Sequence, residues 1–340
     1  MNRHRLINVI AGLVFAAGLA VLLYPLVSDA WNSWRQARLV SEYDERVAAT
    51  SATDNGAAEN DAWFAKANAY NASLSGKGIP DAFAVHSETE SADYLSQLAF
   101  RSDGMMGYIQ IPKIGQSLPI YHGTSDESLA RGVGHLQGSA LPVGGDSTHC
   151  VLSAHRGLPS ASLFTDLDKL EVGDHFYLHV LDRALAYEVD QVLVVDPDQT
   201  ESLDTVAGED LVTLVTCTPY GVNTQRLLVR GHRVAYDEGV ESAELAAGPT
   251  WSIFTQYWLW VAAGLLLVAL FVLWCWRRSC REGEPGPGQA CDPTGLHGPR
   301  HAGGPDASPG PADAVADGEP APRHAPRHAR KGNGGGERHG

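Results

Sequence analysis

The chain has 340 residues, with 25 Lys plus Arg against 40 Asp plus Glu and a formal net charge of -15. A chain of this length has room for one domain of ordinary size with appendages. Residues 28–256 contain 14 basic and 32 acidic residues, so this part repels phosphate backbones, which argues against nucleic acid as a partner.

An apolar run covers residues 6–27, directly after the basic start Met1-Asn2-Arg3-His4-Arg5. About twenty apolar residues can span a bilayer. The alternative is a secretory signal peptide, because Ser28-Asp29-Ala30 has the small-x-small form of a cleavage site. Since the run exceeds the roughly 7 to 15 residues of a signal core, we predict that residues 1–27 are a cytoplasmic N-terminus and an uncleaved transmembrane anchor.

Residues 28–106 are predicted to be mainly helical. Apolar residues recur at helical spacing between Trp31 and Ala72, and the small polar stretch 50–60 predicts a loop between two helices. Residues 76–91 (GKGIPDAFAVHSETES) form a second loop, which contains Asp81 and Phe83. Most exposed loops of this composition are simple connections, which is the alternative to a functional loop here.

Short apolar segments separated by turn signals occupy residues 107–236. Such spacing predicts a mainly β domain, either a barrel or a sandwich. Residues 164–170 are predicted to form one or two helical turns, and residues 237–256 a linker. The predicted strands are residues 108–113, 118–121, 149–154, 175–180, 186–195, 211–216 and 226–234.

A second apolar run, residues 257–276, has two tryptophans near each end, as expected of a transmembrane helix with interfacial aromatic belts. Arginines 277, 278 and 281 follow it, so positive charge flanks the outer end of both predicted spans. We therefore expect both termini in the cytoplasm and the domain between them on the extracellular face.

The tail, residues 277–340, is rich in Gly, Pro, His, Arg and Ala and has hardly any aliphatic residue, which predicts disorder. Its histidines have no metal-ligand spacing, and we expect no metal site there.

The chemistry is concentrated in residues 211–233, LVTLVTCTPYGVNTQRLLVRGHR. Two strand-like runs flank a turn with Pro, Gly and Asn, which predicts a hairpin with Cys217 and Arg226 facing one cleft. A cation near a thiol favours the thiolate and can stabilise an oxyanion, so Cys217 is a candidate nucleophile. The alternative is that Cys217 is a small buried hydrophobic residue.

A catalytic thiol needs a proton donor and acceptor. His155 follows the apolar run 149–154 directly and precedes a Gly-Pro loop, which places it at a strand end. The other histidines of the central region, His122, His135, His149, His175, His179 and His232, lack this setting and are predicted to be ordinary strand or loop residues.

Cys150 is the other cysteine on the predicted extracellular side, where a disulfide with Cys217 would remove the nucleophile. Five extended residues separate Cys150 from His155, roughly 16 Å. If His155 meets Cys217, then Cys150 lies beyond the roughly 7 Å between Cα atoms that a disulfide allows, so we expect Cys150 in the core. Cys275, Cys280 and Cys291 lie at or beyond the second predicted span, on the reducing side.

These motifs resemble the sortases of Gram-positive bacteria. The resemblance rests on Thr213-Leu214-Val215-Thr216-Cys217 with Arg226 nine positions later, and on His155 within SAHRGLPSASLFTDLDKL. The segments GYIQIPKIGQSLPIYHGT and GVGHLQGSALPVGG are similar to the pilin-polymerising class, class C. One departure is Ala154, where the family more usually has Gly, and whose methyl group could narrow the cleft.

The resemblance implies a closed eight-stranded sortase-type β-barrel, here with N-terminal helices and two transmembrane helices. It also implies a cysteine transpeptidase without a cofactor, in which Cys217 attacks an LPXTG-like sorting signal, His155 is the general acid and base, and Arg226 stabilises the oxyanion. The partners would be pilin subunits, with a lysine of the next pilin as acceptor. The alternatives are a wall-anchoring sortase, a secreted cysteine protease, and a non-enzymatic membrane protein.

Pilin-polymerising sortases commonly carry an Asp-Pro-aromatic lid ahead of the barrel. Here Asp81-Ala82-Phe83 keeps the acid and the ring and has Ala for Pro. The resemblance implies that Asp81 pairs with Arg226 and that Phe83 covers Cys217. Without proline such a lid costs more entropy to order, so we expect it to open more readily.

Overall fold

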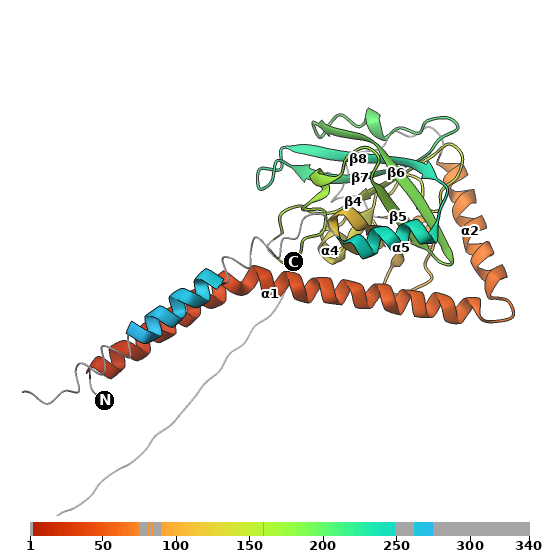
Figure 1. Cartoon of the computed structure of the whole chain (residues 1–340). Coiled ribbons are helices and arrows are strands. Elements are labelled where there is room, and N and C mark those ends of the chain that lie inside the picture. Colours follow the sequence, from red (N-terminus) through yellow and green to blue (C-terminus); the bar gives the residue numbers. More distant parts are fainter. Residues whose placement is uncertain are drawn as a thin grey trace, which may run out of the picture. The chain divides into compact units, whose positions relative to one another are not determined.

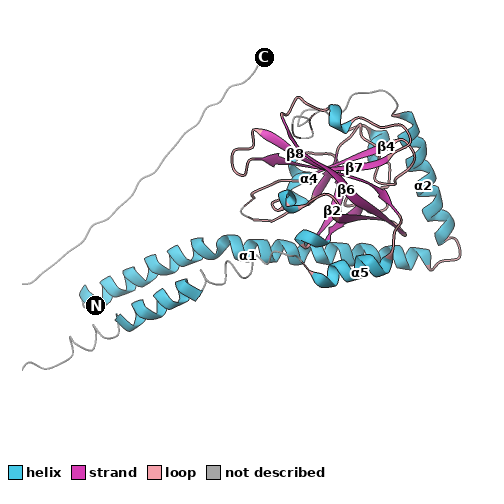
Figure 2. Ribbon diagram, turned by 45° about the horizontal axis from the view of Figure 1, so that its top comes forward, coloured by secondary structure: helices cyan, strands magenta, loops and turns pink. Residues whose placement is uncertain are grey.

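The computed structural model describes residues 3–74, 81, 83, 90–158, 160–248 and 262–274. Its centre is one closed barrel (Figures 1 and 2). The strands follow the spatial order β1-β2-β3-β4-β7-β8-β6-β5. Neighbouring strands are antiparallel except for the parallel pairs β2 with β3 and β4 with β7. The strands are β1 (Met105–Ile111), β2 (Gln116–His122), β3 (Val133–His135), β4 (Thr148–Ser153), β5 (His175–Val180), β6 (Arg183–Val195), β7 (Asp210–Thr218) and β8 (Gln225–Val234).

The predicted closed eight-stranded barrel with N-terminal helices is confirmed. Seven of the strands correspond to predicted segments, and the eighth, β3, was missed. It is a short segment, Val-Gly-His, without a detectable alternation of its own, and it exists because it pairs with both β2 and β4. The predicted helical turn near residue 167 is present as η2 (Leu167–Lys169).

Strand β7 is buried on both faces over residues 211–216, which explains why only Leu, Val and Thr occupy these positions. Val212 and Leu214 point into the barrel core. Val215 belongs to a second apolar cluster, made by Leu136, Val151, Leu203, Val215 and Leu228, with Phe83, Leu193 and Val195 packed against it. The sheet therefore has an apolar outer surface beside the ends of β7 and β8, where the candidate site lies.

Two long helices precede the barrel, α1 (Arg3–Ser51) and α2 (Gly56–Ser73). The connection between them is shorter than the predicted loop 50–60, because α2 already begins at Gly56. A Cβ at this position would collide with the carbonyl group of Thr50, so glycine permits the tight reversal. Val40, Tyr43 and Val47 of α1 pack against Met105, Tyr108 and Tyr121 of the barrel.

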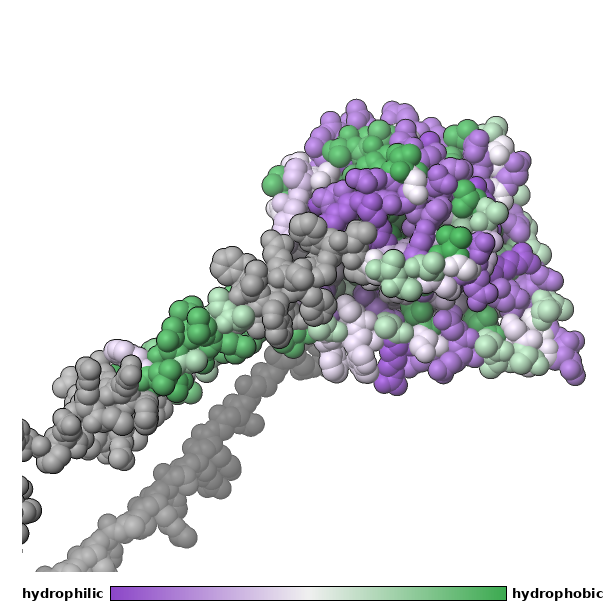
Figure 3. Space-filling view, viewed as in Figure 1, coloured by the Kyte–Doolittle hydropathy of each residue, from purple (hydrophilic) through white to green (hydrophobic). Residues whose placement is uncertain are grey.

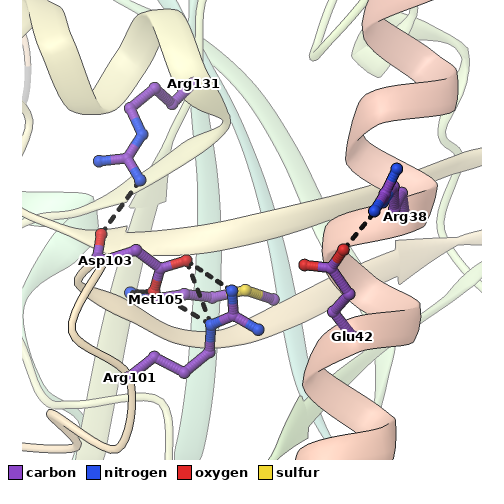
Figure 4. Close-up of polar contacts among 6 residues, drawn as sticks. All are labelled: Arg38, Glu42, Arg101, Asp103, Met105 and Arg131. Atoms are coloured by element: carbon purple, nitrogen blue, oxygen red, sulfur yellow. Dashed lines mark hydrogen bonds and ion pairs between the residues drawn. The ribbon is translucent and has the colours of Figure 1, made fainter.

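The turn that leads into β1 is fixed by one ion pair and by hydrogen bonds (Figure 4). Arg101 donates to both carboxylate oxygens of Asp103, Arg131 donates to the Asp103 carbonyl oxygen at 3.1 Å, and Asp103 caps the Met105 amide. Burial raises the pKa of Asp103, but the hydrogen bonds from Arg101 and Met105 outweigh it and the net pKa is lowered. The two short helices nearby are α3 (Ala92–Leu95) and α4 (Asp126–Arg131).

Within the described residues one helix, α1, is long and apolar enough to span a membrane, over Ile10–Ser51. Helix α1 is continuous, so the predicted anchor and the helix predicted to follow it form a single uninterrupted helix. The fold prediction of two transmembrane helices is not confirmed. Of the second predicted span, residues 262–274 are described as an apolar helix shorter than a span, and the rest lies outside the described residues.

Many of the described apolar residues of both segments are exposed, and Figure 3 shows green surfaces there. Phe15 stacks on Phe271 with ring centroids 5.4 Å apart. The predicted tail, residues 277–340, lies outside the described residues, as do Cys275, Cys280 and Cys291.

The interval 237–256, predicted as a linker, begins with a helix, α5 (Glu238–Ala247), capped by Asp237. Glu241 is buried and accepts hydrogen bonds from His179 Nε2 and Tyr236 Oη, both at 2.7 Å. Glu244 accepts from His175 Nδ1 at 2.8 Å and Tyr177 Oη at 2.7 Å. The chain after β8 is therefore tied to β5 before it continues. The sequence did not predict this docking, because the partners of these carboxylates lie far away in the chain.

Candidate active site

The β7–β8 hairpin places the candidate nucleophile opposite the candidate cation. Cys217 pairs with Arg226 in the antiparallel register, so their side chains lie on the same face of the sheet. The turn between them is closed by hydrogen bonds from the amides of Val222 and Asn223 to the Pro219 carbonyl oxygen, both at 3.0 Å. Asn223 has a φ of 60°, in the left-handed region that Asn tolerates better than most residues.

His155 reaches the same place through the parallel pairing of β4 and β7. Ser153 is in register with Val215, and the pairing continues because Ala154 N donates to Val215 O at 3.2 Å and Thr216 Oγ1 donates to Ala154 O at 2.8 Å. Continuing this register by one residue would place His155 beside Cys217. Ala154 is fully buried in the barrel core, so its methyl group fills the core and does not narrow the cleft.

The loop after His155 is joined to the loop after Cys217 by Arg156, which the sequence analysis did not single out. Its Nη1 donates to Thr218 Oγ1 at 3.1 Å, its Nε donates to Thr165 O at 3.1 Å, and its Nη2 pairs with Asp168. The guanidinium fork thus connects the residue after the histidine with the residue after the cysteine. Its place directly after His155 was the one signal in the sequence.

Gly157, the next residue, also contributes to the contact between the loop after His155 and the turn after Cys217. It has a φ of 78°, and a Cβ here would lie 2.9 Å from the ring of Tyr220, so glycine is required both for the backbone conformation and for the close approach. The Gly157 amide donates to Thr165 Oγ1 at 3.2 Å.

Asp81 lies against Arg226. Arg226 Nε donates to Asp81 Oδ1 at 3.0 Å and Arg226 Nη2 donates to Asp81 Oδ2 at 2.8 Å, which is the bidentate arrangement that a guanidinium and a carboxylate favour. The exposed fractions of the two side chains are only 12% for Arg226 and 11% for Asp81. The guanidinium is therefore occupied by a carboxylate in this structure.

Phe83 fills the space between the candidate residues. Its ring lies 6.2 Å from the His155 ring between centroids, and the guanidinium carbon of Arg226 lies 5.1 Å from its centroid. Phe83 also packs against the outer apolar cluster that contains Val151 and Val215. The Phe83 ring thus contacts the histidine, the arginine and the outer apolar cluster. The structure brings all five predicted site residues together.

The electrostatics differ from the simple expectation for a thiol beside a cation. Burial raises the pKa of Cys217, Arg226 lowers it, and the carboxylate of Asp81 raises it again, with a raised pKa as the net result. The carboxylate of Asp81 thus opposes the effect of the Arg226 guanidinium on the pKa of the thiol. Hydrogen bonding to Asp81 in turn raises the pKa of Arg226.

Cys150 and three of the barrel histidines are buried in the fold, away from the candidate site. Cys150 is a free, buried thiol, as predicted, and burial raises its pKa. His122, His135 and His149 are buried, hydrogen-bonded and have pKa values lowered by burial, to about 4 for His135. In the part of the chain that the structure describes, no group of three or more His, Cys, Asp or Glu side chains could hold a metal ion.

Comparisons with protein families, with known proteins and with solved structures all find similarity to sortases. A family model described as the sortase domain matches residues 109–234. Sortase D of Bacillus subtilis is 30% identical over 166 residues, which cover 48% of this chain and 81% of that protein.

Among solved structures, sortase C of Streptococcus pneumoniae is 45% identical with a TM-score of 0.54, covering 58% of this chain and 97% of that one. Sortase C1 of Streptococcus agalactiae is 50% identical with a TM-score of 0.53, covering 59% and 100%. The study of the pneumococcal structure concerns catalysis and pilin substrate specificity.

Proposed function

Because the chain belongs to the sortase family of cysteine transpeptidases, we propose that it is a pilin-polymerising enzyme that cleaves an LPXTG-like sorting signal and forms lysine isopeptide bonds. The family resemblance inferred from the sequence motifs is confirmed. The pilin substrate is supported by likeness to the sortase C structures, one of which is described in terms of pilin substrate specificity. The observation that carries the proposal is the convergence of Cys217, His155 and Arg226 at the ends of β7, β4 and β8.

In the first half-reaction, Cys217 Sγ attacks the carbonyl carbon of the threonine in the sorting signal, which is bonded to the glycine nitrogen. Since burial raises the thiol pKa, a base must take the proton, and His155 at the end of the neighbouring strand is placed for that role. Arg226 stabilises the oxyanion of the tetrahedral intermediate. The glycine amine leaves with a proton from His155, and an acyl thioester on Cys217 remains.

In the second half-reaction, the side-chain amine of a lysine attacks the thioester carbonyl. His155 takes a proton from this amine, the Cys217 thiolate leaves, and an isopeptide bond joins the two subunits. Both steps need Arg226 free to face the substrate. The Asp81 ion pair and the Phe83 ring occupy the site in the described state, so we propose that residues 76–91 form a lid that must open first.

We further propose that the enzyme acts at the cell membrane. The apolar part of α1 would be the anchor, residues 257–276 a second span, and the barrel would lie on the extracellular face with both termini in the cytoplasm. The exposed apolar surface of α1 and the Arg residues after position 276 support this arrangement. Residues 107–236 are the proposed catalytic domain.

The function is tested with the purified full chain, an LPXTG-type peptide and a lysine-bearing acceptor, with products identified by mass spectrometry. We expect joined peptides from the wild type and none from Cys217→Ala, because the methyl group cannot form the thioester. Cys150→Ala is the matched control, since it removes a buried thiol outside the cleft and should keep activity. Cleaved but never joined products would indicate a protease instead.

A further inference from the structure

Helix α1 contacts the barrel at the loop that follows His155. Asp29 Oδ1 accepts hydrogen bonds from the amide and the hydroxyl group of Ser162, both at 2.7 Å. Asn32 Nδ2 donates to the Ser160 carbonyl oxygen at 2.7 Å, and Ser28 Oγ donates to the same oxygen at 3.4 Å. These contacts join residues about 130 positions apart, and we name them the α1 clasp.

The clasped loop is short and is connected to the backbone of His155. Two residues after Ser162, the amide of Phe164 donates to the His155 carbonyl oxygen at 3.2 Å. The intervening Leu163 has a φ of 39°, an unusual conformation for leucine, and its side chain is buried in the barrel core. The described part of the loop is thus held at His155 on one side and at Ser162 on the other.

The same turn of α1 carries aromatic side chains that do not contact the barrel core. Trp31 is 64% exposed and Trp34 is 53% exposed, and their rings lie 5.4 Å apart. They follow the exposed apolar residues of α1 by one turn or two, which is the position of an interfacial aromatic belt. The α1 clasp would therefore sit where the helix leaves the bilayer.

We propose that Asp29 is a positioning residue for His155, so that the membrane-anchoring helix is also part of the scaffold of the active site. Asp29 holds Ser162, Ser162 fixes the loop that accommodates Phe164, and Phe164 fixes the backbone of His155. This inference rests on the proposed role of His155 in proton transfer. It identifies a function for α1 beyond attachment: the helix sets the histidine relative to Cys217.

The test compares Asp29→Ala, Asp29→Asn and the control Glu45→Ala in the full chain reconstituted in lipid vesicles. Glu45 is an exposed acid on the same helix. For Asp29→Ala we expect kcat to fall about tenfold with KM within about twofold, because a displaced catalytic group slows chemistry more than binding. Asn offers a side-chain oxygen in the same position, so Asp29→Asn should recover most of the lost kcat. Wild-type kcat in Asp29→Ala, or an Asn variant as slow as the Ala variant, would overturn the proposal.

A second measurement is independent of activity. Hydrogen exchange at the amides of Ser162 and Phe164 should be faster in Asp29→Ala than in the wild type, and unchanged in Glu45→Ala. Equal exchange in all variants would refute the positioning role even if the enzyme were inactive for another reason. If the exchange difference between Asp29→Ala and the wild type is found but the wild type joins no peptides, the proposed transpeptidation is contradicted and the positioning role is not.

Discussion

Removing Asp81 and Phe83 should expose Cys217 to reagents in solution. Asp81 accepts two hydrogen bonds from Arg226, and both side chains are almost nine-tenths shielded from solvent. A hydrogen bond to a charged group contributes about 1.5 to 3 kcal/mol. If about 2 kcal/mol of lid closure comes from this pair, its loss shifts the closed-to-open equilibrium about 30-fold, at about 1.4 kcal/mol for each factor of ten.

Two further effects act in the same direction. The carboxylate of Asp81 and the burial of the thiol both raise the pKa of Cys217, so their removal lowers that pKa and increases the thiolate fraction at neutral pH. We therefore expect Asp81→Ala with Phe83→Ala to react with a small methanethiosulfonate reagent at least about 30-fold faster than the wild type. The pH at which the rate is half-maximal should also decrease.

The assay measures the rate of Cys217 modification by mass spectrometry in the full chain, on a Cys150→Ala background so that one thiol of the barrel reports. Asp61→Ala is the matched control, because Asp61 forms an exposed ion pair with Arg183 and such pairs contribute about 0 to 1 kcal/mol. An unchanged modification rate in the double variant, with the circular dichroism spectrum intact, would refute the lid.

Three further results are expected. Arg156→Lys should lower kcat about tenfold with little change in KM, since lysine cannot reproduce the fork that reaches Thr218; equal loss in the exposed control Arg183→Lys would contradict this reason. Hydrogen bonds from His179 and Tyr236 lower the pKa of Glu241 against the effect of burial. The ionised carboxylate therefore stabilises the docking of α5 fully at pH values above the ordinary carboxyl pKa, and this stabilisation is lost as the pH falls through the lowered pKa. The protection factors of the α5 amides, which are corrected for the intrinsic pH dependence of exchange, should therefore fall in the wild type as the pH drops below the ordinary carboxyl pKa, and change less in Glu241→Gln. Protease added to wall-stripped cells should remove residues 28–256 and spare an epitope placed after residue 281, whereas loss of that epitope from intact membranes would contradict the two-pass topology.

The sequence alone predicted the parts of the site that depend on local pairing. The apolar run before Cys217 and the turn residues after it predict a hairpin, and a hairpin brings Cys217 opposite Arg226 because its strands are neighbours in the chain. The histidine could be located at a strand end, but no local rule pairs β4 with β7 across about sixty residues. For His155 and for the Asp81-Ala82-Phe83 lid, family motifs in the sequence supplied the expected partners.

Only the tertiary structure decided the contacts and charges around those residues. The thiol pKa was expected to fall beside a cation, and it rises because burial and Asp81 outweigh Arg226, which the linear order of residues does not reveal. The same holds for β3, which becomes a strand through its two neighbours, and for α5, whose carboxylates find partners on β5. The bonds of Arg156 to Thr218 and of Asp29 to Ser162 join distant segments, and neither partner has a sequence pattern that identifies the other. Local propensity determines most of the helices and strands, whereas β3 and the burial and charge at the site depend on which distant elements the closed barrel and α1 bring together.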